Sequence, residues 1–501
     1  MLRGLLKNTL ISAVAFFAVS VLGIVLVPFL IRAYGVDGFG VIGLARLFIP
    51  LMGFGIFDLG FTEISTQATA KARATGNWDE GAALLGLTLR IAVGVGAVIG
   101  LVLWLLSWQL VHCFSVPEGF QSDFLHAIWI TAALLPLLFA SLVFEGVTKG
   151  FENFKMQRSI EVISAVTYAA FAVAAVWVSA PLEWVCFAFL FGQICRAVMS
   201  FAQSYGLLGQ VGARFEHPSP QAWQEFKKRS PSLTFSKVLS TLQTNSPNLL
   251  IGLLLSPAAV GIYDALTRIP RFAKAVVGLV NATVQPLAVR LDHSESPNDL
   301  SKLVSLGSLL LGSVVLPFYA SAIVFSEPLL RLWLAAKFEP YWPWQAMLFI
   351  TPALMALAGF GASALLNRVD VVKSFNKIAI IQMVIQLGVS LILLSRFDQF
   401  AFVAGQLCSG IVVFVLQMRQ ISQHAKVPNK VYVKLGRVLV FLGVATVCSM
   451  PLAHNVNSLV SLILLGATWG VLGVILSAAL VLSAEQKRQA LSFLINRNQR
   501  N

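Results

Sequence analysis

Apolar stretches long enough to cross a membrane recur from one end of this 501-residue chain to the other. A helix needs roughly 20 predominantly apolar residues to span a hydrocarbon core of about 30 Å. The composition agrees, because only 12% of the residues are charged and 57% are hydrophobic, whereas soluble domains carry about 25% charged residues. We therefore predict an all-α polytopic membrane protein.

The apolar stretches predict about fourteen transmembrane helices. The first begins at Asn8 and runs for more than twenty residues without a cleavage site of the A-x-A type, so we interpret it as a retained helix and not as a signal peptide. The expected spans lie near residues 8–31, 39–62, 82–111, 123–145, 158–179, 182–205, 232–255, 259–288, 302–325, 342–366, 374–394, 399–420, 431–451 and 458–482.

The distribution of basic residues predicts the orientation of these helices. When the N-terminus is placed in the cytoplasm, 25 of the 36 Lys and Arg residues fall in inside loops and tails and only four in outside loops. By the positive-inside rule both termini are then cytoplasmic and the number of helices is even. Because orientation accounts for most of the net charge of +14, we do not expect a nucleic-acid partner.

The sequence carries no pattern for a metal, a cofactor or an ATP motor. The six histidines form no cluster with ligand spacing, and the chain contains no Gly-Lys dipeptide and hence no Walker A signature. None of the cysteines forms a C-x-x-C pair, and we expect them to be small packing residues. They are Cys113, Cys186, Cys195, Cys408 and Cys448.

An internal repeat suggests how the helices are grouped. Sliding the sequence against itself by 221 residues sets "VDGFGVIGLARLFIP" (36–50) beside "PAAVGIYDALTRIPR" (257–271), with Gly40 aligned on Gly261. Six predicted helices separate the two segments, so both enter the membrane from outside. They are therefore expected to be parallel repeats about an axis along the membrane normal.

The repeat predicts two six-helix lobes followed by two further helices. The connection from Gly206 to Ser230 is the longest on the inside, contains "HPSP" and "KKRS", and is predicted to link the lobes. We expect an N-terminal lobe at 1–205, a cytoplasmic linker at 206–230, a C-terminal lobe at 231–425, and two helices with a cytoplasmic tail at 426–501.

Apart from the basic residues at the cytoplasmic ends of spans, which are counted above with the inside loops, seven basic residues lie inside the predicted spans. A basic residue at mid-bilayer costs about 2.5 to 3.5 kcal/mol on insertion scales, so central ones should have a partner or face a polar interior. Lys237 and Arg90 lie near cytoplasmic ends, where their long side chains can reach the interface. The seven are Arg46, Arg90, Arg196, Lys237, Arg268, Arg271 and Lys274.

The segment "VGIYDALTRIPRFAKAVV" (260–277) concentrates these charges in one helix. If the helix starts near Ala259, Arg268 lies about 13 Å deep, close to the midplane. Asp264, Arg268 and Arg271 follow the i, i+4, i+7 spacing of one helix face, and Asp264 can pair with Arg268. We predict a cationic, water-accessible cavity between the lobes; buried structural ion pairs are the alternative.

Two more features support such a cavity. Arg46 lies about 10 Å down the predicted second helix, so the two repeat-related helices offer cations at similar depths. The seventh span, "TFSKVLSTLQTNSPNL" (234–249), is rich in hydroxyl and amide side chains, which suit either interhelical hydrogen bonds or a hydrated wall. We favour the wall and assign Gln243, Asn245 and Asn248 to it.

Four motifs, in order and spacing, resemble the polysaccharide-export family of the multidrug/oligosaccharidyl-lipid/polysaccharide (MOP) flippase superfamily, which includes O-antigen flippases. They are "RAYGVDGFGVIGLA" (32–45), "FDLGFTEISTQATA" (57–70), "FEGVTKGFENFKMQRSIEV" (144–162) and "LSPAAVGIYDALTRI…VQPLAVRL" (255–291). The resemblance implies two six-helix bundles around a central cavity walled by the first, second, seventh and eighth helices. It also implies export of undecaprenyl-diphosphate-linked sugars across the cytoplasmic (inner) membrane by alternating access.

This resemblance, together with the charges, gives the candidate roles. Arg268, Arg271 and Arg46 are expected to attract the diphosphate or acidic sugars, because the planar guanidinium donates two aligned hydrogen bonds. Lys274 has a secondary role, the amides of the polar wall bind hydroxyls, and Asp264 is the candidate for ion coupling. The expected partners are the lipid-linked oligosaccharide, membrane lipid and polysaccharide polymerase machinery.

Two rival functions are open at this point. An ion-coupled drug or metabolite antiporter of the same superfamily would share the fold, but a pump for cationic drugs would need net negative charge in its cavity. A membrane enzyme such as an O-antigen polymerase or ligase would normally present a sizeable outside loop, and the outside connections here are short. We therefore predict a flippase and not an enzyme.

Overall fold

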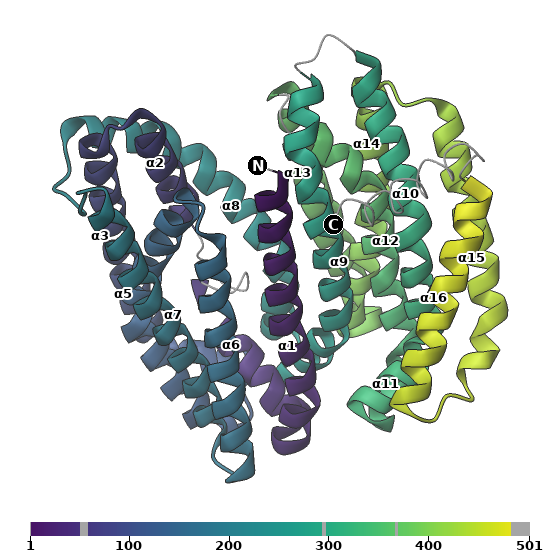
Figure 1. The fold of residues 1–501 in the computed structure, drawn as a ribbon. Coiled ribbons are helices and arrows are strands. Elements are labelled where there is room, and N and C mark those ends of the chain that lie inside the picture. The colour runs from purple at the N-terminus through teal and green to yellow at the C-terminus, as the bar shows by residue number, and fades with distance from the viewer. Residues whose placement is uncertain (1, 51–58, 293–296, 366–368, 482–501) are drawn as a thin grey trace. The chain divides into compact units, whose positions relative to one another are not determined.

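The computed structural model describes residues 2–50, 59–292, 297–365 and 369–481 (Figure 1). Within these residues the regular structure is entirely helical, with sixteen α-helices and short 3₁₀ turns between some of them. The chain divides into two compact units, Met1–Ala265 and Leu266–Asn501. Each unit has its own buried apolar core.

Ten helical stretches among the described residues are long and apolar enough to cross a membrane. One of the ten, residues 373–425, contains two consecutive helices, α13 (Val369–Phe397) and α14 (Ala401–Ala425). Two further long helices, α8 (Pro220–Leu254) and α9 (Pro257–Asp292), are not among the ten. The prediction of an all-helical multi-pass protein is confirmed, and the count of fourteen spans stays a prediction.

The first unit is a helical bundle arranged around α5. Helices α2, α3 and α7 all pack on α5, and α6 packs between α1 and α7. The amide of Asn77 caps α3 and that of Asn153 caps α6, each accepting a hydrogen bond from a backbone N–H three residues on. The bounds of these helices, and of the short α4 between α3 and α5, are α1 (Leu2–Arg46), α2 (Phe61–Thr75), α3 (Trp78–Leu105), α4 (Ser107–Cys113), α5 (Gln121–Gly150), α6 (Phe154–Trp177) and α7 (Leu182–Gln210).

The helix predicted over 39–62 is not continuous. The element α1 runs to Arg46 and consists of two helical segments joined across a kink at Gly35, whose φ of 73° lies in the left-handed region. After Arg46 the chain leaves the helix, and α2 begins only at Phe61, behind Gly60 with a φ of 81°. Glycine adopts positive φ at little cost, and a right-handed helix cannot continue through such a residue. Residues 51–58, within the predicted span, lie outside the described residues.

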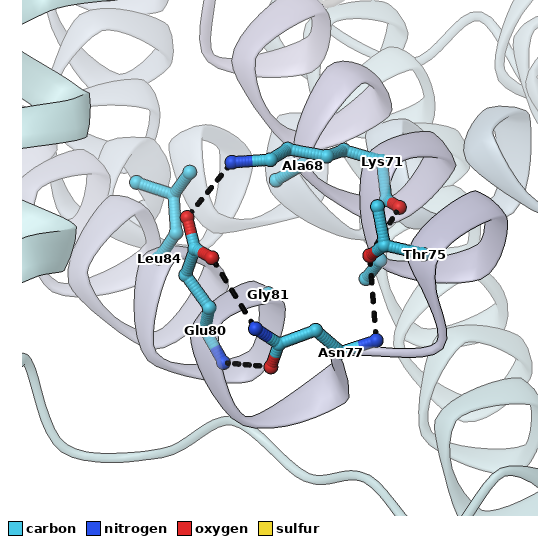
Figure 2. Close-up of a pocket in the computed structure, with 8 residues that line it drawn as sticks. Ala68, Lys71, Thr75, Asn77, Glu80, Gly81 and Leu84 are labelled. Atoms are coloured by element: carbon cyan, nitrogen blue, oxygen red, sulfur yellow. Dashed lines mark hydrogen bonds and ion pairs between the residues drawn. The ribbon is translucent and has the colours of Figure 1, made fainter.

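A network of polar contacts closes the turn between α2 and α3 (Figure 2). The Lys71 ammonium lies 2.8 Å from a Glu80 carboxylate oxygen, and the Asn77 amide donates to the other oxygen at 3.4 Å. The Thr75 hydroxyl donates to the Lys71 carbonyl at 3.0 Å. The enclosed space is about 10 Å³, which is room for roughly one water molecule. This pocket is therefore part of a structured turn and not a ligand site.

The second unit is built around α10 (Pro297–Val324). Helices α12, α15 and α16 pack on α10, and α14 packs on α12 and α13. Val304, Leu357 and Val438 belong to its buried core. The other elements not yet introduced are α11 (Ser326–Leu334), α12 (Trp342–Leu365), α15 (Asn429–Ala453) and α16 (Leu459–Val481).

Helix α16 docks on α10 through small residues. Gly470 and Gly473 of α16 approach Phe318 and Pro317, and the Ser321 hydroxyl donates to the Gly466 carbonyl at 2.8 Å. The outer faces of α15 and α16 expose large apolar side chains such as Val440 and Ile463. Such faces are unfavourable in water and suit contact with lipid.

Candidate functional site

The two segments aligned by the internal repeat meet in the first unit. Gly40 lies in α1 after the kink, and Gly261 lies in the first turns of α9. A Cβ atom on Gly40 would overlap the Pro257 carbonyl oxygen, and one on Gly261 would overlap the Val36 carbonyl oxygen. The two helices therefore cross in backbone contact, which requires glycine at both positions.

Arg46, six residues beyond Gly40, is held between two aromatic rings. Its guanidinium carbon lies 4.6 Å from the ring centroid of Phe189 in α7 and 4.9 Å from that of Tyr168 in α6. One Nη donates a hydrogen bond to the Tyr168 hydroxyl. The Arg46 Nε is buried without a hydrogen-bond partner among the described residues. This cation–π environment holds the charge inside the first unit, and the predicted contact with substrate stays a prediction.

A second cation of the first unit has a carboxylate partner. Arg196 of α7 and Glu145 of α5 form a bidentate ion pair, with Nε–Oε1 and Nη2–Oε2 distances of 2.6 and 2.9 Å. The two side chains are only 12% and 6% exposed. For Arg196 the alternative stated above therefore holds: its charge inside a span belongs to a buried structural ion pair. The position of Glu145 near a cytoplasmic helix end predicts a cap or a pair with a loop cation; its partner is instead a cation within a span.

The two cations predicted to reach the interface both contact polar groups near helix ends. The Lys237 ammonium lies 3.2 Å from Glu63 in the first turn of α2. The Arg90 guanidinium lies 3.0 Å from the His217 ring nitrogen, in the connection before α8. Arg90 is exposed and Lys237 is half-buried, as expected for long side chains that extend toward water.

The predicted polar wall lies in the second half of α8. Asn245 and Asn248 are almost completely buried, whereas Gln243 is partly exposed. The Asn248 amide oxygen has no hydrogen-bond partner among the described residues. Pro247 removes one backbone N–H from the helix at this level. Polar groups therefore concentrate inside the first unit, and their contact with substrate stays a prediction.

Helix α9 carries the remaining predicted residues. Asp264 is buried, Arg268 and Arg271 are partly exposed, and Lys274 is exposed. The three basic residues are spaced by three positions, so they lie along one side of the helix. We call Arg268, Arg271 and Lys274 the cationic stripe. Among the described residues, no group of three or more His, Cys, Asp or Glu side chains is arranged to hold a metal ion.

Comparison with known sequences identifies the family. Residues 5–292 match the family described as polysaccharide biosynthesis protein, which is more than half of the chain. The chain belongs to this family. The matched region includes nearly all of α1, the aromatic environment of Arg46 and the cationic stripe.

One relative and two solved structures are similar to this chain. The chain is 20% identical over 337 residues to the Shigella flexneri protein named "Putative O-antigen transporter", covering 67% of this chain and 78% of that protein. It is similar to the inward closed conformation of the lipid II flippase MurJ, with a TM-score of 0.72, 13% identity, and coverage of 94% of this chain and 98% of that one. An inward-facing MATE family multidrug resistance transporter of the MOP superfamily matches with a TM-score of 0.68, 12% identity, and coverage of 83% and 99%.

These findings confirm several predictions from the sequence. The predicted family is confirmed, and the helical fold is similar to the folds of the MurJ flippase and the MATE transporter. The residues that sequence reasoning missed are Tyr168 and Phe189. Both are more than 120 positions from Arg46, and no local spacing indicates the contact. The ion pair between Arg196 and Glu145 has a signal in the sequence, because the two residues carry opposite charges and both fall within predicted spans.

Proposed function

We propose that this protein translocates an undecaprenyl-diphosphate-linked oligosaccharide, such as an O-antigen or other polysaccharide repeat unit, to the outer leaflet of the cytoplasmic membrane by alternating access. Its family membership supports this proposal, as does the Shigella relative named for O-antigen transport. The fold shared with a lipid II flippase adds support. We also propose that the chain crosses the membrane fourteen times, with both termini in the cytoplasm. In this proposal residues 1–205 and 231–425 form the two lobes, residues 206–230 link them, and residues 426–501 contain two further helices and a tail.

The observation that carries the proposal is the cationic stripe of α9. Arg268 and Arg271 are partly exposed and Lys274 is exposed, although all three lie in a helix of a membrane protein. Such residues are unfavourable in lipid and are retained where they serve a function. An arginine suits a diphosphate, because its planar fork donates two parallel hydrogen bonds to phosphate oxygens. We assign Arg268 and Arg271 to the diphosphate and Lys274 to a secondary attraction.

The other candidate residues receive supporting roles. Gln243, Asn245 and Asn248 supply amide groups for sugar hydroxyls, and Arg46 adds positive charge. Asp264 is the candidate for ion coupling. Outward movement of two negative charges from an inside-negative cell releases about 2.3 kcal/mol per charge per 100 mV, so the membrane potential alone supplies about 4 to 5 kcal/mol. Membrane lipid and the polymerase machinery that receives the product are the expected partners.

The test compares two pairs of arginines in the protein's own host. The chromosomal copy is replaced by Arg268→Ala/Arg271→Ala or by the control Arg419→Ala/Arg437→Ala, whose arginines are exposed in α14 and α15. Lipid extraction and mass spectrometry then quantify the undecaprenyl-linked oligosaccharide at matched expression. Charge-assisted hydrogen bonds contribute about 1.5 to 3 kcal/mol each, so export should fall by about tenfold or more in the first variant. Equal export in both variants would contradict the proposal.

An ion-coupled drug or metabolite antiporter is the second candidate. The fold likeness to a multidrug resistance transporter favours this candidate, and the basic stripe opposes a cationic drug as substrate. The same strains separate the two functions. If oligosaccharide export is normal in the Arg268→Ala/Arg271→Ala strain while its drug susceptibility changes, antiport becomes the favoured function.

A further inference from the structure

A pocket of about 460 Å³ lies in the second unit between the N-terminal parts of α10 and α15. It is separate from every residue assigned to the transported substrate. Lys302, Leu306 and Lys430 on its rim are exposed, so the pocket is open to the surroundings. The residues that line it are Ser301, Lys302, Ser305, Leu306, Leu309, Pro428, Lys430, Val431 and Lys434.

The polar part of the lining is strongly basic. Three of its described residues are lysines and none is acidic. Lys430 and Lys434 are four positions apart on α15 and so share a helix face. The Lys434 ammonium donates one hydrogen bond to the Val481 carbonyl at 2.8 Å, and an ammonium has three donors. The N-terminus of α15 adds a partial positive charge, because its first backbone N–H groups lack helical partners.

Two serines on α10 add hydroxyl groups to this basic rim. The Ser301 hydroxyl donates to the Lys426 carbonyl at 2.9 Å. The Ser305 hydroxyl, one turn further along α10, is buried and has no hydrogen-bond partner among the described residues. A buried hydroxyl without a partner is unfavourable. An oxygen acceptor that entered the pocket would satisfy it.

The rest of the lining is apolar and lies further along α10. Leu306 and Leu309 lie one and four residues beyond Ser305, and Val431 contributes from α15. Leu309 and Val431 are buried, whereas Leu306 is 38% exposed. A ligand that fits this lining must carry an anionic oxygen group at one end and hydrocarbon at the other. A soluble phosphate ion would contact the polar rim alone.

We propose that this pocket binds the headgroup of an anionic phospholipid, with the lysines and Ser305 around its phosphate and an acyl chain along Leu306 and Leu309. The proposed orientation, with cytoplasmic termini, places the starts of α10 and α15 on the cytoplasmic side. Anionic lipids are enriched there, and basic pockets between transmembrane helices bind their headgroups. The site depends on this orientation but not on the transported substrate.

Binding is measured on the full-length protein in detergent by native mass spectrometry. The probes are dioleoyl phosphatidylglycerol, which is anionic, and dioleoyl phosphatidylcholine, which is zwitterionic. The pocket variant is Lys302→Gln/Lys430→Gln/Lys434→Gln, and the control Lys228→Gln/Lys373→Gln/Lys377→Gln removes three exposed lysines elsewhere. One lysine near a membrane surface contributes about fivefold in affinity, so the pocket variant should lose about 100-fold for phosphatidylglycerol.

The outcomes separate a lipid site from a site for soluble phosphate and from nonspecific charge attraction. Selective phosphatidylglycerol binding that is lost in the pocket variant and kept in the control supports the proposal. Equal binding in both variants overturns it. Displacement of the lipid by millimolar inorganic phosphate also overturns it, because the pocket would then be a site for soluble phosphate. If the triple variant does not fold, Lys430→Glu, at an exposed position, tests the same charge dependence and should weaken binding at least fivefold.

Discussion

Gly40 of α1 and Gly261 of α9 lie in backbone contact, such that a Cβ atom on Gly261 would be 3.1 Å from the Gly40 nitrogen. These are the two residues that the internal repeat sets in register. The residues that the repeat sets in register are therefore in contact, and the arrangement of two repeated lobes stays a prediction.

Gly40→Ala is expected to destabilise the first unit. The added methyl group would overlap the Pro257 carbonyl oxygen, which belongs to the backbone and cannot rotate away. Overpacking of this kind costs about 1 to 3 kcal/mol or more, so the thermal unfolding midpoint in detergent should fall by several degrees. The matched control is Gly43→Ala in the same helix, whose Cβ would make an ordinary contact, 3.6 Å from Val260. Equal midpoints for the two variants would contradict the close helix crossing.

Removing the carboxylate of the buried ion pair should be more harmful than removing both charges. Glu145→Gln leaves the Arg196 guanidinium buried without its counterion, which costs about 3 to 5 kcal/mol. Glu145→Leu/Arg196→Met removes both charges and should recover most of that loss, because apolar pairs of similar volume pack well. The measurement is the thermal midpoint of each variant in detergent.

The control for this experiment is an exposed pair of the same chemistry. Glu152 lies 3.6 Å from Arg73, with both side chains about half exposed or more. Surface pairs contribute about 0 to 1 kcal/mol, so Glu152→Gln should hardly change the midpoint. If the double variant at 145 and 196 is as unstable as Glu145→Gln, then packing, and not the uncompensated charge, is the cause.

Tyr168→Phe is expected to separate a structural role of Arg46 from a role in transport. The variant removes the hydroxyl that accepts a hydrogen bond from Arg46 but keeps the aromatic ring beneath its charge. Loss of a partner for a charged donor costs about 1 to 3 kcal/mol, and Tyr205→Phe at an exposed position is the control. If Arg46 only supports the bundle, the midpoint falls and export at matched protein level is unchanged. A change in export without a change in midpoint would favour the substrate role.

Much of the fold could be predicted because hydropathy is a local property. Nearly every long apolar stretch is a helix in the described residues, and the helices that contain charged residues can be read directly from the sequence. The span over 39–62 was wrong for a specific reason. Averaged hydropathy does not report backbone conformation, so it shows neither that the helix ends at Arg46 nor that Gly60, just before α2, adopts a positive φ. A glycine with a positive φ changes the path of the backbone, and its hydropathy does not indicate that conformation.

The environment of each candidate residue was less predictable than its position. The depth of Arg46 follows from counting residues along a helix, but its contact with Phe189 depends on how α1, α6 and α7 pack. When each span is considered alone, Glu145 and Arg196 each carry a free-energy cost for placing a charge in the membrane. Only the folded structure shows that the two side chains lie 2.6 Å apart and compensate each other. Membrane charges must therefore be interpreted in pairs, across spans, before they are assigned to a substrate.

Gly473→Val is expected to loosen α16 from α10. A Cβ atom at Gly473 would lie 2.8 Å from the Pro317 side chain, and a branched residue adds two further carbons at that contact. Small residues allow close helix packing in membranes, where no hydrophobic effect drives association. Hydrogen exchange should therefore increase in residues 317–321 of α10 and along α16. Gly443→Val in α15 is the control, because a Cβ there meets no atom within 4 Å. Unchanged exchange in the Gly473 variant would mean that contacts other than this glycine hold α16 in place.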